Sequence, residues 1–574
     1  MQTRTTAAAG FMALVLVLGL AVPGAGPARA VAWNATRGAE AAPPQPLVLT
    51  EGLAIEGVAT GGRWAASADA LLSAWIGGSF DPATVKAGDT IRLSDGTVRT
   101  WKEARAAGQG VFAPAEMRRG YLLVRIESER ARTMLLEAAG HTMVYVDGSP
   151  RVGDPYGNGT VRLPVALRQG VSTLLFAPAG RGNVTARLVP LPEFGGPAYF
   201  LPGADTLPDV LGVGGGTVQL ATLMMNTSDR PIAVVVESTG PGQDAPVRGE
   251  AVTIPPMSVR KVAVAAAPGV MAARAARKIE LRAFAVPAGG EVAAAPSDTA
   301  TLTLRNRDEF TEPHKRTFVS GIDGSVQYYA VRPGPRRPVS RSERQPSLPL
   351  IVSLHGASVE AIGQAEAYGP SDFADIVCPT NRRPFGFDWE DWGRLDAYEV
   401  IRDFERNGYA PPQPERVYLT GHSMGGHGTW QLGVLDPGRW AGIGPSAGWA
   451  SFSTYTGAGQ TDPMGETWGP IFRRAGASSD TLALISNLAE VPVYILHGQK
   501  DDNVPLSEAR RMAEALKGFH RDWQIFEQPD AGHWWDQGPF GPEPGAACVD
   551  WPPMMDLFRR RRNEPPATVS FATV

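Results

Sequence analysis

Three residues in the C-terminal half of the chain have the types and the order needed for nucleophilic catalysis. Ser423 lies in the pentapeptide Gly-His-Ser-Met-Gly, Asp501 follows an apolar run, and His533 comes after both. A serine hydroxyl is a poor nucleophile until a base accepts its proton, and a carboxylate can orient that base. The sequence therefore predicts acyl transfer by a serine, a histidine and an aspartate.

The strongest local pattern surrounds Ser423. Residues 417–419 predict a strand, and the residues after Gly426 predict a helix. A sharp turn between the two would hold the hydroxyl above the edge of a sheet, and the glycines at 421 and 425 would let strand and helix approach closely. The alternative is a glycine-rich loop without a catalytic serine, because Gly and Ser are common residues.

The base and the acid are chosen by their places relative to strands. Two histidines, His520 and His533, follow the pair Asp501 and Asp502. His520 lies at a predicted helix end, whereas His533 lies in a loop after a predicted strand at 523–526. Active-site residues of open parallel sheets lie on loops beyond the carboxyl ends of the strands, which favours His533. The spacing does not separate the two aspartates; we favour Asp501 and interpret Asp502 as a turn or helix N-terminal acid.

Acyl transfer also needs N–H donors for the developing oxyanion, and loss of one donor typically costs ~3 kcal/mol. We expect the backbone N–H of Met424 to be one donor. The second is expected at Ala357, in the loop after the apolar run at 350–354. The other histidines near these motifs are interpreted as structural: His355, His422, His427 and His497.

Several tryptophans lie near the predicted active-site loops. Trp389, Trp392 and Trp534, with Trp535, are candidates to line a pocket for aromatic or sugar-linked acyl groups. The alternative is domain packing, since tryptophan is highly buried on average.

Residues 309–563 have the pattern of an α/β domain. Apolar runs at 350–354, 417–419 and 491–496 predict buried strands. Apolar residues at helical spacing over 395–404, and a second run at 507–517, predict helices between them. This alternation predicts a doubly wound, mostly parallel sheet with helices on both faces. A C-terminal tail, 564–574, follows.

The preceding residues predict two all-β sandwich domains, at 31–200 and 201–308. Short β-like runs alternate with Gly, Pro, Asp and Asn, and the pairs at 147–148 and 158–159 are turn signals. The motifs around 144–165 resemble jelly-roll accessory domains of secreted enzymes. The second domain is expected to be immunoglobulin-like, with an alanine-rich stretch at 270–277 as a candidate short helix.

Residues 1–30 have the pattern of a signal peptide. Arg4 precedes an apolar stretch at 11–22, and Ala28-Arg29-Ala30 is a typical cleavage site. The stretch is shorter than the ~20 residues that span a bilayer; an uncleaved anchor is the alternative. We therefore expect a secreted or periplasmic protein. In that compartment Cys378 and Cys548 can form one disulfide, and two cysteines alone cannot build a structural zinc site.

The charge of the chain excludes a strong electrostatic attraction to nucleic acid. Its 58 acidic and 54 basic residues leave a net charge of −4, and no basic run carries interleaved aromatic residues.

Taken together, the motifs resemble those of a known branch of enzymes. His355-Gly356, the stretch 421–426, His497-Gly-x-x-Asp501 and Ala531-Gly-His533 resemble the prolyl-oligopeptidase-like branch of the α/β-hydrolases. They are also similar to secreted esterases related to feruloyl esterases and polyhydroxybutyrate depolymerases. In that branch the acid lies four residues after the histidine of His-Gly, which implies Asp501. The resemblance covers residues 310–562.

The chain departs from true prolyl oligopeptidases in two ways. It has no repeated propeller blades, and Met424 follows the serine where those enzymes often have tyrosine. The resemblance implies a serine hydrolase that cleaves ester or peptide bonds through an acyl-enzyme, without a cofactor or metal. We expect a carboxylesterase, with a serine-type peptidase as the alternative and an inactive hydrolase-fold binding protein as the second.

The same resemblance implies the kind of partner. We expect a small-molecule ester, a peptide or a polymer-linked acyl group as substrate, and no membrane contact after signal cleavage. The sequence sets no oligomeric state.

Overall fold

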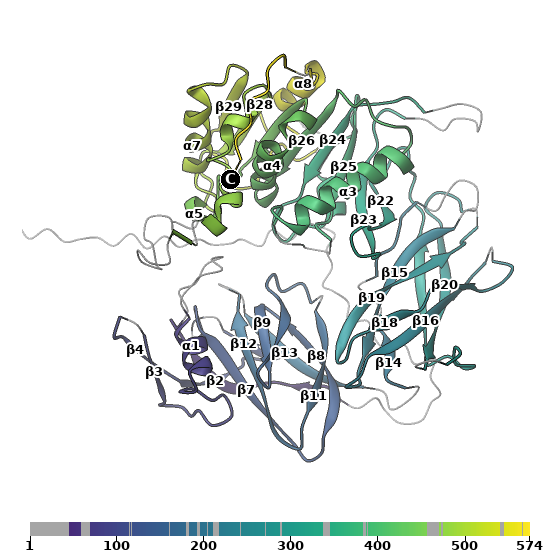
Figure 1. The fold of residues 1–574 in the computed structure, drawn as a ribbon, viewed down its shortest axis with the longest axis vertical. Coiled ribbons are helices and arrows are strands. Elements are labelled where there is room, and N and C mark those ends of the chain that lie inside the picture. The colour runs from purple at the N-terminus through teal and green to yellow at the C-terminus, as the bar shows by residue number, and fades with distance from the viewer. Residues whose placement is uncertain are drawn as a thin grey trace, which may run out of the picture.

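A computed structural model describes residues 45–573 of the chain, and the predicted signal peptide lies outside the described residues. Three sheet systems follow one another along the chain (Figure 1). No helix among the described residues is long and apolar enough to cross a membrane. The residues left out within 45–573 are 59–68, 94, 109, 114, 116, 160, 180–182, 192–195, 202, 204, 211–216, 242, 270, 288–289, 337–344, 383–385, 387, 456–469, 472–473, 540–544 and 565.

The first part of the chain forms two large antiparallel sheets that share one core, and β3 pairs with β4 in a separate small sheet. One has the order β1-β13-β8-β11 with β6 beside β13, and the other the order β10-β9-β12-β7-β2-β5. Leu122 and Phe176 of the second sheet meet Leu136 and Leu188 of the first in that core. The elements of this part are β1 (Leu47–Val48), β2 (Glu51–Ile55), α1 (Ala70–Ile76), β3 (Thr90–Arg92), β4 (Val98–Thr100), β5 (Lys102–Arg105), β6 (Val111–Phe112), β7 (Tyr121–Ser128), β8 (Arg132–Ala139), β9 (His141–Val146), β10 (Ser149–Asp154), β11 (Arg162–Leu167), β12 (Gly170–Pro178) and β13 (Val184–Pro190).

The second part repeats this construction with fewer strands. A sheet of order β14-β15-β19 packs against one of order β17-β16-β20-β21, in which β18 also pairs with β16. The candidate short helix at 270–277 is wrong: residues 271–275 are not helical, and Ala276 begins β20. The strands are β14 (Ala198–Phe200), β15 (Val218–Asn226), β16 (Ile232–Thr239), β17 (Val247–Arg248), β18 (Val252–Ile254), β19 (Ser258–Ala266), β20 (Ala276–Val286) and β21 (Asp298–Arg305).

The third part is built on an eight-stranded sheet of order β22-β23-β25-β24-β26-β27-β28-β29. The pairs β22–β23 and β23–β25 are antiparallel, and all later pairs are parallel. The sheet is therefore mostly parallel, as the alternating sequence pattern predicts. Its strands are β22 (His314–Val319), β23 (Val326–Arg332), β24 (Leu350–Leu354), β25 (Asp375–Pro379), β26 (Val417–His422), β27 (Gly442–Ser446), β28 (Val493–Gly498) and β29 (Trp523–Gln528).

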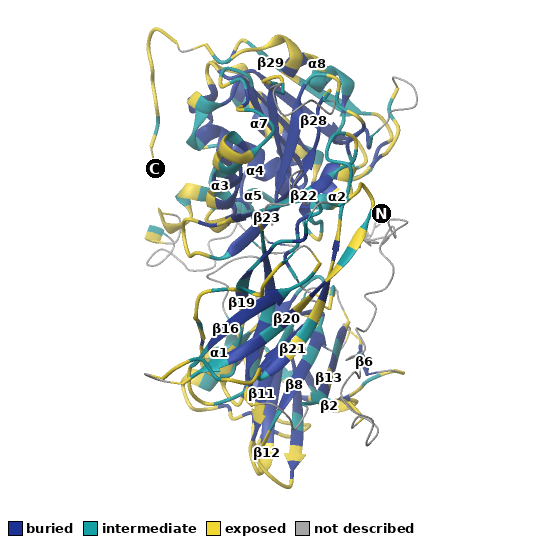
Figure 2. Cartoon of the chain, turned by 90° about the vertical axis from the view of Figure 1, so that its right-hand side faces the viewer, coloured by how far each residue is buried: buried dark blue, intermediate teal, exposed yellow. Residues whose placement is uncertain are grey.

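Helices cover both faces of this sheet. Strand residues alternate between the two cores: Leu350 and Val352 of β24 face one side, and Ile351 faces the other. Every residue of β24 to β28 is buried, so the centre of the sheet is dark blue in Figure 2. The first face is covered by α3 (Trp392–Asn407), α4 (Met424–Leu435) and α7 (Leu506–Lys517), and the second by α2 (Ala361–Glu366) and α8 (Pro552–Arg560).

The two cysteines lie in the core beneath α2 and α8. Cys378 of β25 and Cys548 are both buried, and both are free thiols. The disulfide that the sequence left open is therefore not formed. Burial raises the pKa of both thiols, which keeps them protonated at neutral pH.

The third part of the chain packs against the second. Strand β15 lies beside β22, and the Thr317 hydroxyl donates to the backbone carbonyl of Gln219 at 2.6 Å. The backbone N–H of Lys315 donates to the Asp209 carboxylate at 3.0 Å. In Figure 1 the α/β part lies at the top, with the first β part below it and the second at the right.

The start of α4 crosses close to β24 because both positions that face it are glycine. A Cβ atom added at Gly425 would overlap the carbonyl of Leu354, and one added at Gly421 would overlap the carbonyl of Gly425. Backbone atoms cannot move aside as a flexible side chain can. The Gly-x-Ser-x-Gly spacing is therefore a packing requirement of this crossing.

We predict that Gly425→Ala destabilises the folded protein by about 1–3 kcal/mol, the usual cost of overpacking. Gly438→Ala is the matched control, because a Cβ there would meet no atom within 4 Å. Thermal unfolding of both variants checks this. Equal unfolding midpoints for the two would contradict the packing argument.

Candidate active site

Ser423 occupies the turn between β26 and α4. Its backbone has φ 59° and ψ −118°, a conformation that a non-glycine residue holds only when its surroundings enforce it. The Ser423 N–H donates to the carbonyl of Ser446 in β27 at 2.9 Å, and its carbonyl accepts the N–H of His427 at 3.1 Å. The side chain is 6% exposed. The turn thus fixes the hydroxyl at the carboxyl edge of the sheet.

The structure brings Ser423, His533 and Asp501 together in one hydrogen-bonded chain. His533 Nε2 lies 2.9 Å from Ser423 Oγ, and His533 Nδ1 lies 2.8 Å from Asp501 Oδ2. Since a carboxylate only accepts, Nδ1 carries the hydrogen, and in the neutral ring Nε2 is left with a lone pair toward the hydroxyl. This is the geometry that a general base needs. Asp502 is exposed, and His520 donates to the carbonyl of Val491 instead.

Asp501 is held as a carboxylate by its surroundings. Burial opposes its ionisation, but hydrogen bonds from His497 and His533 outweigh that cost and hold its pKa below the usual range. The backbone N–H groups of Asn503 and Val504 donate to Oδ1 at 2.9 and 2.8 Å. The acid is therefore fixed in position and charged.

Two further histidines support this arrangement, and the sequence analysis gave neither a role in it. His422 Nε2–H donates to the carbonyl of His533 at 2.8 Å, which anchors the loop that carries the base. Burial lowers the pKa of His422 to about 3, so its ring is neutral. His497 Nε2 lies 2.9 Å from the Val504 carbonyl and 3.3 Å from Asp501 Oδ2. Their positions directly before Ser423 and four residues before Asp501 are the sequence signal for these roles.

The loop after β24 lies against the serine. A Cβ added at Gly356 would lie 3.4 Å from Ser423 Cβ. His355 is fully buried, with Nδ1 2.9 Å from the Gly356 carbonyl and Nε2 3.2 Å from the Thr380 carbonyl. Ala357 is half-buried at the next position. The loop is therefore fixed in the place where the expected second oxyanion donor would lie.

The three predicted pocket tryptophans have different surroundings. Trp389 is 0% exposed and its Nε1–H donates to the His355 carbonyl at 3.1 Å, so its predicted contact with substrate is wrong and it supports the loop instead. Trp392 is 59% exposed and lies over the guanidinium of Arg382. Trp534 is 38% exposed and packs edge-on against His422. Trp392 and Trp534 therefore remain available to a bound molecule.

A second cluster of titratable side chains, which includes His427 and Glu390, lies beside the turn at Ser423. His427 Nε2 is 3.0 Å from Glu390 Oε1, and its Nδ1 is 3.0 Å from the Trp449 carbonyl. Burial disfavours the imidazolium, but Glu390 and the charge of Asp388 outweigh it and raise the pKa of His427. Asp388, Glu390 and His427 are the described residues whose ligand atoms, all within 4.8 Å, could hold a metal ion. In this structure they pair with one another and with backbone groups.

The fold and this site define a class of protein. A mostly parallel sheet, a serine at a sharp strand-to-helix turn, and an acid and a histidine on later loops are the features of an α/β-hydrolase. Residues 383–551 match the prolyl oligopeptidase family. The resemblance predicted from the motifs is thus confirmed, and this part of the chain has an α/β-hydrolase fold that matches that family.

Two curated proteins each match about two fifths of the chain. One, named as an uncharacterized secreted protein of Arthroderma benhamiae, is 28% identical over 251 residues, which are 42% of this chain and 27% of that protein. The other, the uncharacterized peptidase YuxL of Bacillus subtilis, is 24% identical over 249 residues, 39% of this chain and 37% of that protein. The chain thus spans less than two fifths of the length of these relatives.

Solved structures are more distant. The S-formylglutathione hydrolase of Agrobacterium tumefaciens is 17% identical, with a TM-score of 0.31, over 39% of this chain and 90% of its own. An acylaminoacyl peptidase is 12% identical, with a TM-score of 0.36, over 84% of this chain and 71% of its own. Neither likeness is close enough to carry an activity over to this chain.

The charge of Asp501 gives a pH-dependent prediction. Because its pKa is lower in the folded than in the unfolded protein, ionised Asp501 stabilises the fold above its ordinary pKa of 3.8, and this contribution is lost as the pH falls below that value. The difference in thermal midpoint between wild type and Asp501→Asn should therefore be largest at neutral pH and shrink on acidification. Asp502→Asn, at an exposed position, is the control. A difference that stays constant from neutral pH to pH ~3 would contradict the charged role.

Proposed function

We propose that residues 309–563 form a serine hydrolase that cleaves carboxylic esters through an acyl-enzyme. The observation that supports this most directly is the pair of hydrogen bonds, 2.9 and 2.8 Å long, that links Ser423, His533 and Asp501. The fixed turn at Ser423 and the charged state of Asp501 supply the two other requirements, a positioned nucleophile and a partner for the imidazolium.

The proposed reaction has two halves. Ser423 Oγ attacks the carbonyl carbon of the substrate while His533 Nε2 accepts the hydroxyl proton, and Asp501 stabilises the imidazolium. The imidazolium then gives its proton to the leaving alcohol or amine. A water molecule, deprotonated by the same nitrogen, attacks the acyl-enzyme, and Ser423 recovers its proton as the acid departs.

We assign the oxyanion hole to the backbone N–H groups of Met424 and Ala357. Met424 is the first residue of α4, where N–H groups lack helical partners and the helix dipole is positive. Ala357 belongs to the loop that lies against Ser423. We place Trp392 and Trp534 at the substrate pocket, because both expose an indole ring. Trp534 packs against His422, and Trp392 follows by three residues Trp389, which bonds the loop after β24.

A serine-type peptidase is the alternative, favoured by the match to the prolyl oligopeptidase family and by the name of the Bacillus subtilis relative. We favour the ester because the described residues before the hydrolase part form paired antiparallel sheets and not repeated blades. The second alternative is an inactive binding protein, in which the hydrolase fold is a relic.

The proposal includes the wider organisation of the chain. We propose a signal peptide at 1–30, a jelly-roll-like domain at 31–200, an immunoglobulin-like domain at 201–308 and a tail at 564–574. The exported protein would act outside the cytoplasm on small esters, peptides or polymer-linked acyl groups. Neither a cofactor nor a nucleic acid is needed for this chemistry.

Ser423→Ala should lower kcat for p-nitrophenyl acetate by about 10⁴-fold or more, because the variant has no nucleophile. Ser507→Ala, at an exposed position of α7, is the matched control and should keep wild-type turnover. Near-wild-type hydrolysis by Ser423→Ala would refute the assignment.

Two further experiments separate the alternatives. Failure of the wild type to react with a fluorophosphonate probe would favour the inactive binding protein. A panel of acyl esters, feruloyl esters and aminoacyl amides separates esterase from peptidase.

His422→Ala should lower kcat by roughly fivefold, with KM little changed, because the loop of His533 loses one hydrogen bond worth about 1 kcal/mol. His520→Ala is a matched control, since His520 is also buried and also donates to a backbone carbonyl, at 2.8 Å, but away from the site. The two variants are compared by steady-state ester hydrolysis. Equal kcat values for both would show that His422 serves stability alone.

A further inference from the structure

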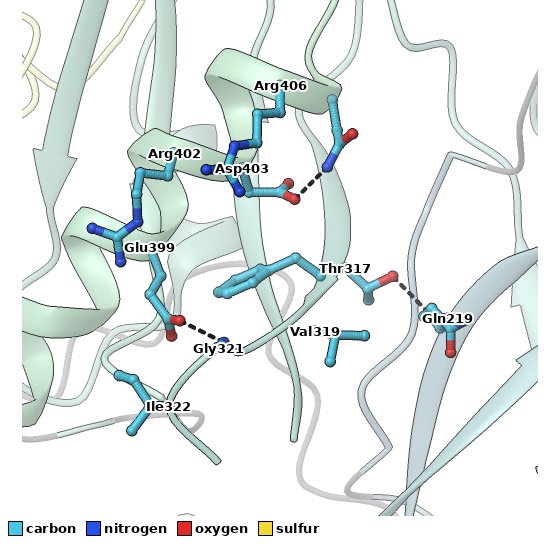
Figure 3. Close-up of a pocket in the computed structure, with 11 residues that line it drawn as sticks. Gln219, Thr317, Val319, Gly321, Ile322, Glu399, Arg402, Asp403 and Arg406 are labelled. Carbon is cyan, nitrogen blue, oxygen red and sulfur yellow. Dashed lines mark hydrogen bonds between the residues drawn. The ribbon is translucent and has the colours of Figure 1, made fainter. Parts of the chain in front are cut away.

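A cavity of about 640 Å³ lies where the hydrolase part meets the second β part. Figure 3 shows four charged side chains of α3 along its wall: Glu399, Arg402, Asp403 and Arg406. These positions are three or four residues apart, so they share one face of the helix. The opposite wall comes from β22 and the loop after it, and Gln219 of β15 closes one side. Boundaries between domains are common places for ligand sites.

The two acids of this wall are already satisfied. Glu399 accepts the Ser320 hydroxyl at 2.6 Å and the Gly321 N–H at 2.7 Å. Asp403 accepts the Tyr329 hydroxyl at 2.9 Å and the Asn407 amide at 2.8 Å. Both oxygens of each carboxylate therefore have donors, and these groups need no ligand.

The two arginines of this wall, unlike the two acids, are not satisfied by neighbouring side chains. Arg402 and Arg406 are exposed, and among the residues that the structure describes neither guanidinium has an ion-pair or hydrogen-bond partner. They are four residues apart on α3, a separation that places side chains next to each other. A guanidinium presents parallel N–H donors that match a carboxylate or a phosphate. The wall therefore offers paired donors for an oxyanion.

The remaining lining restricts what that anion can be. Glu399 and Asp403 place two carboxylates beside the two arginines, so the formal charges of these four side chains sum to zero and the wall has no excess positive charge to hold a second negative charge on the ligand. Val319 and Ile322 on the facing wall are 54% and 39% exposed, so this side of the cavity presents aliphatic surface to water. An aliphatic chain placed there would remove both from water.

The geometry points to a second binding site in this cavity, for a monocarboxylate with an aliphatic body, held by Arg402 and Arg406 at its head and by Val319 and Ile322 along its chain. The site is separate from Ser423 and does not depend on the proposed reaction. Because Gln219 belongs to the second β part, such a ligand would contact both parts of the chain.

Isothermal titration of the full-length protein with octanoate, acetate and inorganic phosphate tests this assignment. We expect saturable octanoate binding that is tighter than acetate or phosphate binding. The double variant Arg402→Gln/Arg406→Gln should weaken octanoate binding by about tenfold or more, the usual effect of losing charge-assisted hydrogen bonds. Ile322→Ala should weaken octanoate binding and leave acetate binding unchanged.

The control for net charge is Arg521→Gln, at an exposed arginine elsewhere in the hydrolase part, which should bind octanoate as the wild type does. Both substituted arginines are exposed and glutamine favours helices, so an unchanged thermal midpoint verifies that the double variant is folded. Octanoate binding that persists in the double variant would place the ligand at another site, such as the serine. That result, tighter binding of phosphate, or no binding would overturn the assignment.

Discussion

The hydrogen bond between Ser423 and His533 is the interaction on which the proposed chemistry depends. Its two residues are 110 positions apart in the chain, and the Oγ–Nε2 distance of 2.9 Å exists only because separate loops end at one edge of the sheet. The parallel pairing of β26, β27, β28 and β29 produces that edge. The N–H of Ser423 also bonds to Ser446 at the end of β27, so the neighbouring strand positions the nucleophile directly.

The groups around this bond keep it short by restricting the loops rather than by touching a substrate. His422 holds the backbone of His533, His497 contacts Asp501, and Trp389 holds the carbonyl of His355. All three are buried; His422 and Trp389 each link the loops of two different strands, whereas His497 holds the loop after β28 in place. A nucleophile and base held in this way need little rearrangement before reaction, which is the main source of catalytic power in preorganised sites.

The sequence was sufficient to predict those elements whose local pattern of apolar residues matches the element found in the structure. The run at 350–354 became β24 without change, and the helix expected around 395–404 became α3. Strand β27 was not predicted, because its sequence, Gly-Ile-Gly-Pro-Ser, has low β-propensity. It is a strand because β26 and β28 pair with it on both sides. Its glycine at 444 is explained by packing, because a side chain there would collide with Met554 of α8.

In the candidate site, too, the sequence predicts some residues, and only the structure shows the roles of the others. The order of serine, acid and histidine selected Ser423 and His533, and the family resemblance selected Asp501 over Asp502. Nothing local in the sequence shows that His422 bonds a carbonyl 111 residues away. Nor could the sequence distinguish the fully buried Trp389 from the exposed Trp392, since both follow the same strand. Spacing identifies groups that can react, whereas contacts between distant loops decide which groups support them.

The most direct test of the central claim is a crystal structure of the protein after reaction with a fluorophosphonate. The account predicts phosphorus bonded to Ser423 Oγ, a phosphoryl oxygen facing the N–H groups of Met424 and the loop after β24, and His533 still bonded to Asp501. A probe attached to another residue, or a reacted serine with His533 turned away from it, would contradict the account.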